Sequence, residues 1–130
     1  QEGICNPILL GNPDRLTRLA TRLKLDLTGV EIIDMRADQE QGRRATFAKH
    51  LTEKRSRQGY TFDEAYDKMY ERNYFGMSMV ENGYADAFIT GLYTKYSNTI
   101  KVAKEVIGVP FYWEWFSRLH FVRTAAYCIS

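Results

Sequence analysis

The chain has 130 residues, of which 45% are hydrophobic and 26% are charged, and its formal net charge is +2. This length and balance suit a single soluble globular domain with a real core. The small net charge gives no electrostatic argument for nucleic-acid binding, and no run is apolar for long enough to span a membrane.

The cysteines and histidines give no sign of a metal or disulfide framework. Cys5 and Cys128 lie near opposite ends and form no CxxC pair, so a reducing cytoplasm is the expected location. His50 and His120 have no second histidine or cysteine at ligand spacing, so no metal site is predicted. The sequence begins with Gln1 rather than methionine, which suggests a piece of a longer protein.

The first third of the chain alternates strand and helix signals. The segment "NPILLG" predicts a buried strand at residues 8–10 that ends at Gly11. Asn12 is a good N-cap and Pro13 suits the first helical position, so a helix is predicted over residues 13–25. The segment "VEIID" predicts a second strand.

Further helices and one more strand are predicted downstream. Apolar spacing predicts a helix over residues 40–57, broken by "RQGY". In "TFDE", Thr61 and Glu64 form a capping box, which predicts a helix running to about Asn73. The segment "YFGMSMVENG" predicts a short turn or helix, "ADAFIT" a third strand, and "YSNTIKVAKEVIG" a helix closed by its glycine. The alternation predicts an α/β fold, a mostly parallel sheet with helices on both faces.

The junction before the last predicted helix is rich in short polar side chains. Gly91 ends the predicted third strand, and Thr99 and Lys101 lie where the helix begins. Free N–H groups and the helix dipole favour an anion at such a place, and Lys101 would add a full charge. The structural alternative is that Lys101 is solvated and that one polar residue only caps the helix, namely Ser97, Asn98 or Thr99.

A second basic cluster, "KRSRQG", contains Lys54, Arg55 and Arg57 at the end of a predicted helix. A role in reading phosphate would need one arginine to turn into the same cleft as the helix after Gly91. The alternative is that these cations complement the dipole at the C-terminus of their helix.

Four segments taken together resemble the phosphate acetyltransferase and phosphate butyryltransferase family. They are "PILLGNPDRLTRLA", "LTEKRSRQGYTFDEA", "YFGMSMVENGYADAFITG" and "YSNTIKVAKEVIG". In detail they look most like the carboxy-terminal domain of bacterial hybrid NADP-dependent malic enzymes, the oxaloacetate-decarboxylating malate dehydrogenases. The resemblance implies a partial phosphate acetyltransferase-like (isocitrate/isopropylmalate dehydrogenase-like) domain at residues 1–108. Residues 109–130 form an aromatic tail that does not align with the family. Its helical spacing predicts a helix that covers bare surface or contacts another chain.

The resemblance implies a ligand site for coenzyme A or phosphate, carried by Arg55, Gly91, Thr99 and Lys101. Lys101 stands where the family has an arginine, and lysine lacks the planar fork that binds two oxygens. The family's serine, arginine and aspartate constellation belongs to a downstream half that this sequence does not contain, so no catalytic residue is predicted.

Three functions follow from these observations. The leading expectation is a regulatory and oligomerising module of a malic enzyme, which senses acetyl-CoA or an acyl phosphate and forms a homo-oligomer. In that case NADP and a divalent metal would belong to the absent catalytic part, and this chain would hold no cofactor. The alternatives are part of an authentic phosphate acyltransferase and a ligand-free interaction domain. Neither nucleic acid nor a membrane is expected as a partner.

Overall fold

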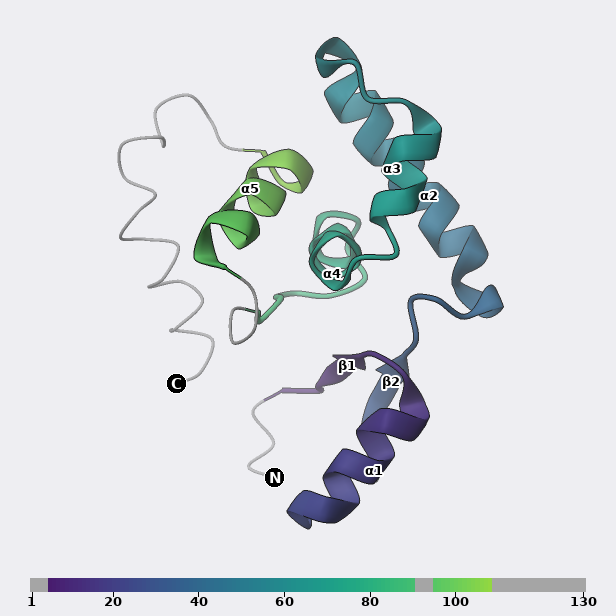
Figure 1. Ribbon diagram of the computed structural model, residues 1–130, viewed down its shortest axis with the longest axis vertical. Coiled ribbons are helices and arrows are strands. Elements are labelled where there is room, and N and C mark those ends of the chain that lie inside the picture. Colours follow the sequence, from purple (N-terminus) through teal and green to yellow (C-terminus); the bar gives the residue numbers. More distant parts are fainter. Residues whose placement is uncertain (1–4, 91–94, 109–130) are drawn as a thin grey trace.

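The computed structural model describes residues 5–90 and 95–108. The sheet and one helix form one end of the molecule, and four helices form the other (Figure 1). In chain order the elements are β1 (Ile8–Leu10), α1 (Pro13–Leu23), β2 (Glu31–Ile33), α2 (Gln41–Arg55), α3 (Phe62–Lys68), α4 (Arg72–Glu81) and α5 (Tyr96–Val106), with 3-10 turns η1 (Asp38–Glu40) and η2 (Ser56–Gln58) on either side of α2. Gly91 and the tail at residues 109–130 lie outside the described residues.

The two strands pair in parallel, as the alternation of elements predicts. Leu9 of β1 lies opposite Ile32 of β2, and the N–H of Gly11 extends the ladder by donating to the oxygen of Ile33 at 2.9 Å. The predicted bounds of β1 are confirmed, and β2 is one residue shorter at each end than "VEIID". The strands separate α1 on one side from α2–α5 on the other (Figure 1).

The predicted start of α1 is confirmed. The side chain of Asn12 accepts a hydrogen bond from the N–H of Arg15 at 3.1 Å, and Pro13 occupies the first turn. The helix ends at Leu23 rather than at residue 25, because Lys24 adopts a left-handed conformation with φ 55°. Its N–H then satisfies carbonyl groups of the last turn.

The long helical region after β2 is divided differently from the prediction. The capping box is confirmed, because Thr61 accepts from the N–H of Glu64 at 3.3 Å and Glu64 accepts from the N–H of Thr61 at 3.2 Å. The helix that it opens, α3, ends at Lys68 instead of near Asn73. A tight turn follows, and the segment predicted as a short turn or helix is the ten-residue helix α4.

The predicted third strand is wrong for the described segment 85–90, which forms neither helix nor strand. Its side chains contact α4 instead. Gly76 of α4 leaves room for the ring of Phe88, and the hydroxyl of Thr90 donates to Oδ1 of Asn73 at 2.8 Å. The segment has the apolar pattern of a strand, but within the described residues β1 and β2 pair only with each other, so it has no ladder to join.

The core lies between β2 and helices α2–α5. Phe47 of α2 and Phe75 of α4 meet edge-on, with ring centroids 5.3 Å apart. The buried side chains of the core are Ile33, Met35, Phe47, Ala48, Leu51, Ala65, Met69, Tyr74, Phe75, Met77, Met79, Val102, Ala103 and Val106. In the part of the chain that the structure describes, no helix is long and apolar enough to cross a membrane.

A buried arginine joins this core to the sheet. Arg44 of α2 donates from Nη1 to the main-chain oxygens of Met35 and Ala37, at 2.6 and 2.8 Å. Its guanidinium also lies over the ring of Tyr70, 4.8 Å from the centroid. Because both oxygens belong to the turn after β2, Arg44 fixes where the sheet meets α2.

Candidate ligand site around helix α5

The start of α5 has no side-chain cap. Lys95 is the N-cap residue and makes no capping hydrogen bond through its side chain. Ser97, Asn98 and Thr99 all lie inside the helix, so the expectation that one of them caps it is wrong. Within the described residues, no acceptor is found for the N–H groups of the first two helical residues, Tyr96 and Ser97. As far as residues 5–90 and 95–108 show, the start of α5 therefore offers main-chain donors of the kind that bind anions in other proteins.

Thr99 is the unusual residue of this first turn. Its side chain is 8% exposed, and its hydroxyl oxygen is buried without a hydrogen-bond partner in the described structure. An unpaired buried hydroxyl costs about 1–3 kcal/mol. Buried polar groups without a hydrogen-bond partner are rare in native proteins. A bound ligand that hydrogen-bonds to the Thr99 hydroxyl would remove this cost, which singles out Thr99 among the predicted site residues.

Lys101 points to a different side of α5. Two residues along an α-helix turn the direction by about 200°, so Lys101 and Thr99 cannot share one wall. The Lys101 side chain is 66% exposed, and Nζ lies 3.9 Å from Oε1 of Glu105, one turn further on. The lysine is therefore a solvated surface cation with a loose intrahelical ion pair.

Arg55 binds the opposite end of α5. Its Nε donates to the main-chain oxygen of Glu105 at 2.8 Å, and its Nη2 donates to the oxygen of Lys104. Thr99 lies six residues earlier, which is about 9 Å along the helix axis. The structure therefore does not bring the guanidinium to the start of α5. Lys54 acts similarly, since Nζ donates to the oxygen of Ile107 at 2.6 Å. Arg55 and Lys54 therefore complement a helix dipole, as the alternative reading expected. The helix is α5, however, and not α2, which carries them.

A polar cluster that the sequence did not predict surrounds the side chain of Glu105. Oε2 accepts from the hydroxyls of Tyr60 at 2.7 Å and Tyr74 at 2.5 Å, and Nζ of Lys68 lies 3.4 Å away. Nζ of Lys68 also donates to the hydroxyl of Tyr74 at 3.1 Å. The loop before α3, the end of α3, the start of α4 and α5 therefore meet at one carboxylate.

Contacts within this cluster shift the pKa values of Glu105, Lys68 and Tyr74. Burial works against the carboxylate, but hydrogen bonds from Tyr74 and Tyr60 and the charge of Lys68 hold the pKa of Glu105 below its usual value. Burial likewise works against the ammonium of Lys68, yet the two tyrosine hydroxyls and Glu105 raise its pKa. Burial and Glu105 raise the pKa of Tyr74. Near neutral pH Lys68 and Glu105 therefore form an ion pair beside a neutral Tyr74 hydroxyl, which suits a structural clamp rather than proton transfer.

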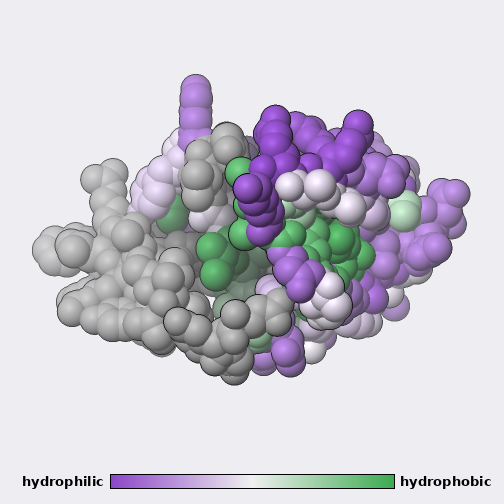
Figure 2. Space-filling view, turned by 90° about the horizontal axis from the view of Figure 1, so that it is seen from below, coloured by the Kyte–Doolittle hydropathy of each residue, from purple (hydrophilic) through white to green (hydrophobic). Residues whose placement is uncertain are grey.

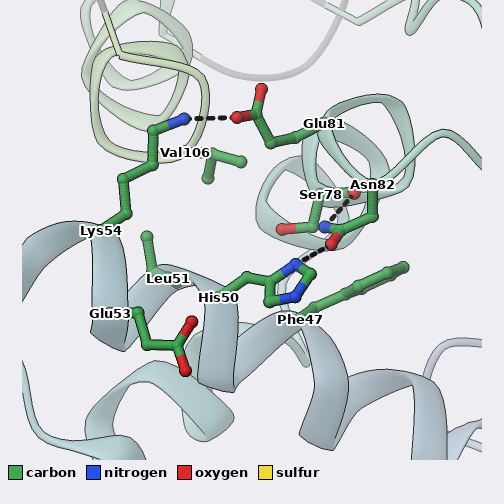
Figure 3. A pocket seen from close by; sticks show the side chains of 9 residues that line it. All are labelled: Phe47, His50, Leu51, Glu53, Lys54, Ser78, Glu81, Asn82 and Val106. Carbon is green, nitrogen blue, oxygen red and sulfur yellow. Dashed lines mark hydrogen bonds and ion pairs between the residues drawn. The ribbon is translucent and has the colours of Figure 1, made fainter.

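A pocket of about 460 Å³ opens beside the C-terminal end of α5 (Figure 3). Its polar side chains are paired, Lys54 with Glu81 and His50 with Asn82. It is lined by Phe47, His50, Leu51, Glu53, Lys54, Ser78, Glu81, Asn82 and Val106. Two carboxylates and the carbonyl end of α5 make it unfavourable for an anion. Among the described residues, no group of three His, Cys, Asp or Glu side chains could hold a metal ion.

The comparisons with known proteins identify the family. The family described as Phosphate acetyl/butaryl transferase matches residues 1–125. The chain belongs to this family. It is 33% identical over 106 residues to a phosphate acetyltransferase of Corynebacterium glutamicum and 31% identical over 107 residues to one of Thermoanaerobacterium thermosaccharolyticum. Each match covers 82% of this chain and 31% of the relative, so the chain spans about a third of the relatives' length.

A solved structure supports the same conclusion. EutD phosphotransacetylase from Staphylococcus aureus superposes with a TM-score of 0.67 at 26% identity, over 82% of this chain and 31% of that one. The predicted fold class, a parallel sheet with helices in a phosphate acetyltransferase-like arrangement, is confirmed.

Proposed function

We propose that the chain forms part of a phosphate acyltransferase, which moves an acyl group between coenzyme A and phosphate. Membership of the family and relatives named phosphate acetyltransferases support this reading over a malic-enzyme module. The observation that carries it is the start of α5, where a buried, unpartnered Thr99 hydroxyl lies in the first turns of an uncapped helix. An anionic group of the substrate would accept hydrogen bonds there.

Because Lys101 lies on a different side of α5 from Thr99, it would contact a second part of an extended ligand such as coenzyme A rather than the group held at Thr99. The ammonium of Lys101 is exposed and its ion pair with Glu105 is long, and a loose pair at the surface contributes about 0–1 kcal/mol. A phosphate group would compete for the ammonium at little cost. The resemblance assigns Arg55 and Gly91 to the ligand as well. For Arg55 this requires the guanidinium to leave the carbonyls of α5, so we propose that it contributes mainly by holding that helix in place.

A second candidate rests on the lysine itself. A lysine in place of the family's arginine gives a point charge instead of a fork for two phosphate oxygens. That change favours sensing over turnover, as in a regulatory module of an NADP-dependent malic enzyme that binds acetyl-CoA or an acyl phosphate. NADP and a metal would then bind the catalytic part of such an enzyme. A ligand-free interaction domain is the third candidate.

Calorimetric titration of the chain with acetyl phosphate and with coenzyme A tests the proposal. We expect Lys101→Ala to weaken binding about tenfold, as for loss of one charge-assisted contact. Lys49→Ala is a matched control, because the Lys49 side chain is about as exposed as that of Lys101 and also makes a long i,i+4 pair, with Glu53 at 4.0 Å. Equal affinities for the two variants would exclude a ligand role for Lys101.

A further variant separates the first two candidates. Lys101→Arg restores the fork of the family. In a transferase that contains this chain together with the rest of the fold, the proposal predicts faster acetyl transfer to phosphate for Lys101→Arg. If the unmodified protein and the Lys101→Arg variant both bind acetyl-CoA tightly and neither transfers the acetyl group to phosphate, the sensing module is favoured instead.

A further inference from the structure

The pocket beside the C-terminal end of α5 lies where three helices end. Its lining comes from the second half of α2, the last turn of α4 with the residue that follows it, and the last residue of α5 (Figure 3). The C-terminal end of a helix carries a partial negative charge from its free carbonyl groups. Three such ends therefore adjoin one cavity of about 460 Å³, a volume that is typical of sites for small molecules.

The deeply buried part of the lining is apolar. Phe47, Leu51 and Val106 line the pocket and are only 1%, 3% and 4% exposed. Apolar residues are also visible between hydrophilic ones on the face of the molecule that Figure 2 shows. Apolar walls with a few polar groups beside them are the usual composition of a ligand pocket. A ligand that fills this pocket therefore has an apolar body.

The hydrogen-bond donors of the polar lining are largely used within the protein. Nζ of Lys54 donates to Oε1 of Glu81 and, at 2.6 Å, to a main-chain oxygen just beyond α5. Nδ2 of Asn82 donates to the main-chain oxygen of Ser78 at 2.8 Å. Oδ1 of Asn82 accepts from Nδ1 of His50, and because a neutral imidazole has a single N–H, this contact leaves Nε2 as an acceptor.

Several acceptors of the lining, by contrast, have no donor among residues 5–90 and 95–108. Oγ of Ser78 accepts no hydrogen bond there, and its own hydroxyl donates only to the sulfur of Met69 at 3.6 Å. Glu53 makes only the long pair with Lys49, and its side chain is 63% exposed. The lining thus holds two carboxylates and the one ammonium that pairs with Glu81, so one negative charge is left over. Free acceptors and a spare negative charge favour a cationic ligand that donates hydrogen bonds.

We propose that this pocket binds a small organic cation, namely a primary amine attached to a short alkyl or aryl body. The apolar body packs against Phe47, Leu51 and Val106, and the ammonium donates to acceptors of the polar lining. Lys54 shows the same chemistry inside the protein, because its ammonium is held by a carboxylate and by a carbonyl at the end of a helix. The site goes beyond the proposed function, since Val106 lies about 10 Å along α5 from Thr99 and the amine takes no part in acyl transfer.

The test titrates the 130-residue chain with phenethylamine and follows the amide NMR shifts. Phenethyl alcohol and hydrocinnamate are matched probes, because they carry the same ring on a short chain but are neutral and anionic. We expect saturable shifts at residues 47–54 and 78–82, with a dissociation constant for the amine of about 1 mM or lower. The alcohol and the carboxylate should bind at least about tenfold more weakly. Equal binding of the three probes, or no saturable shift at these residues up to about 10 mM amine, overturns the proposal.

Two variants test the charge of the pocket in opposite directions. Lys54→Met frees Glu81 and the carbonyl beyond α5, so the amine should bind about tenfold more tightly. Glu53→Gln removes the exposed carboxylate without affecting the core and should weaken binding about threefold, which keeps the test available if Lys54→Met folds poorly. Glu31→Gln, an exposed change in β2, is the control and should leave the affinity unchanged. Weaker binding by Lys54→Met, or the same affinity for Glu53→Gln and Glu31→Gln, overturns the proposal.

Discussion

Arg55, at the last position of α2, donates a hydrogen bond from Nε to the main-chain oxygen of Glu105 in α5 at 2.8 Å. Its side chain therefore joins the ends of two helices that are 50 residues apart in the sequence. The resemblance implies that Arg55 binds phosphate, whereas the structure shows that it holds the end of α5. Experiments on stability and on ligand binding can separate these two roles.

The first prediction concerns this contact. Arg55→Ala should lower the free energy of unfolding by about 1–3 kcal/mol, because carbonyls at the end of α5 lose their donors. Arg57→Ala, which changes an exposed arginine two residues away, should lie within about 0.5 kcal/mol of the unmodified protein. Urea unfolding followed by circular dichroism gives both values. Equal stability of the two variants would show that the Arg55 contact is not formed in solution.

The second prediction concerns pH. The pKa of Glu105 is lowered in the folded state, so its stabilising contribution is complete above the pKa of an ordinary carboxyl group. That contribution should be lost as the pH falls through the lower folded-state pKa. Glu105→Gln should cost about 1.5–3 kcal/mol at pH 7 and much less at strongly acidic pH. A difference between the two proteins that stays constant over the acid range would contradict the charged cluster.

The third prediction concerns the close approach of residues 85–90 to α4. A Cβ on Gly76 would overlap the ring of Phe88, so Gly76→Ala should destabilise the protein by about 1–3 kcal/mol. Gly42 in α2 has open space around it, and Gly42→Ala should stabilise by about 0.5–1 kcal/mol. Thermal unfolding of both variants tests the packing. A stabilising effect of Gly76→Ala would mean that Phe88 lies elsewhere.

Signals that act within a few residues were readable from the sequence. Asn12 with Pro13 and Thr61 with Glu64 specify helix starts through bonds between residues three apart, and both were predicted correctly. The third strand depends on a ladder partner that no local pattern reveals, and there the prediction was wrong.

The candidate site could be predicted only in part, because its contacts also join residues that are far apart in the sequence. Thr99 was singled out by its place at a helix start, but its burial depends on how α5 packs. Glu105 resembles any solvated helical glutamate in sequence, and its partners Tyr60 and Tyr74 lie 45 and 31 residues away. The resemblance could name Arg55, yet it could not show which helix end the side chain contacts.

The Thr99 hydroxyl gives the fourth prediction and the most direct test of a ligand site at the start of α5. Valine has the same shape without the unpaired hydroxyl, so Thr99→Val should raise the free energy of unfolding by about 1 kcal/mol. The decisive measurement is calorimetric binding of coenzyme A and acetyl phosphate to this variant and to the unmodified chain, beside their melting temperatures. The account predicts opposite changes, a higher melting temperature and about tenfold weaker binding. Unchanged affinity, or no binding of either compound by the unmodified chain, would contradict it.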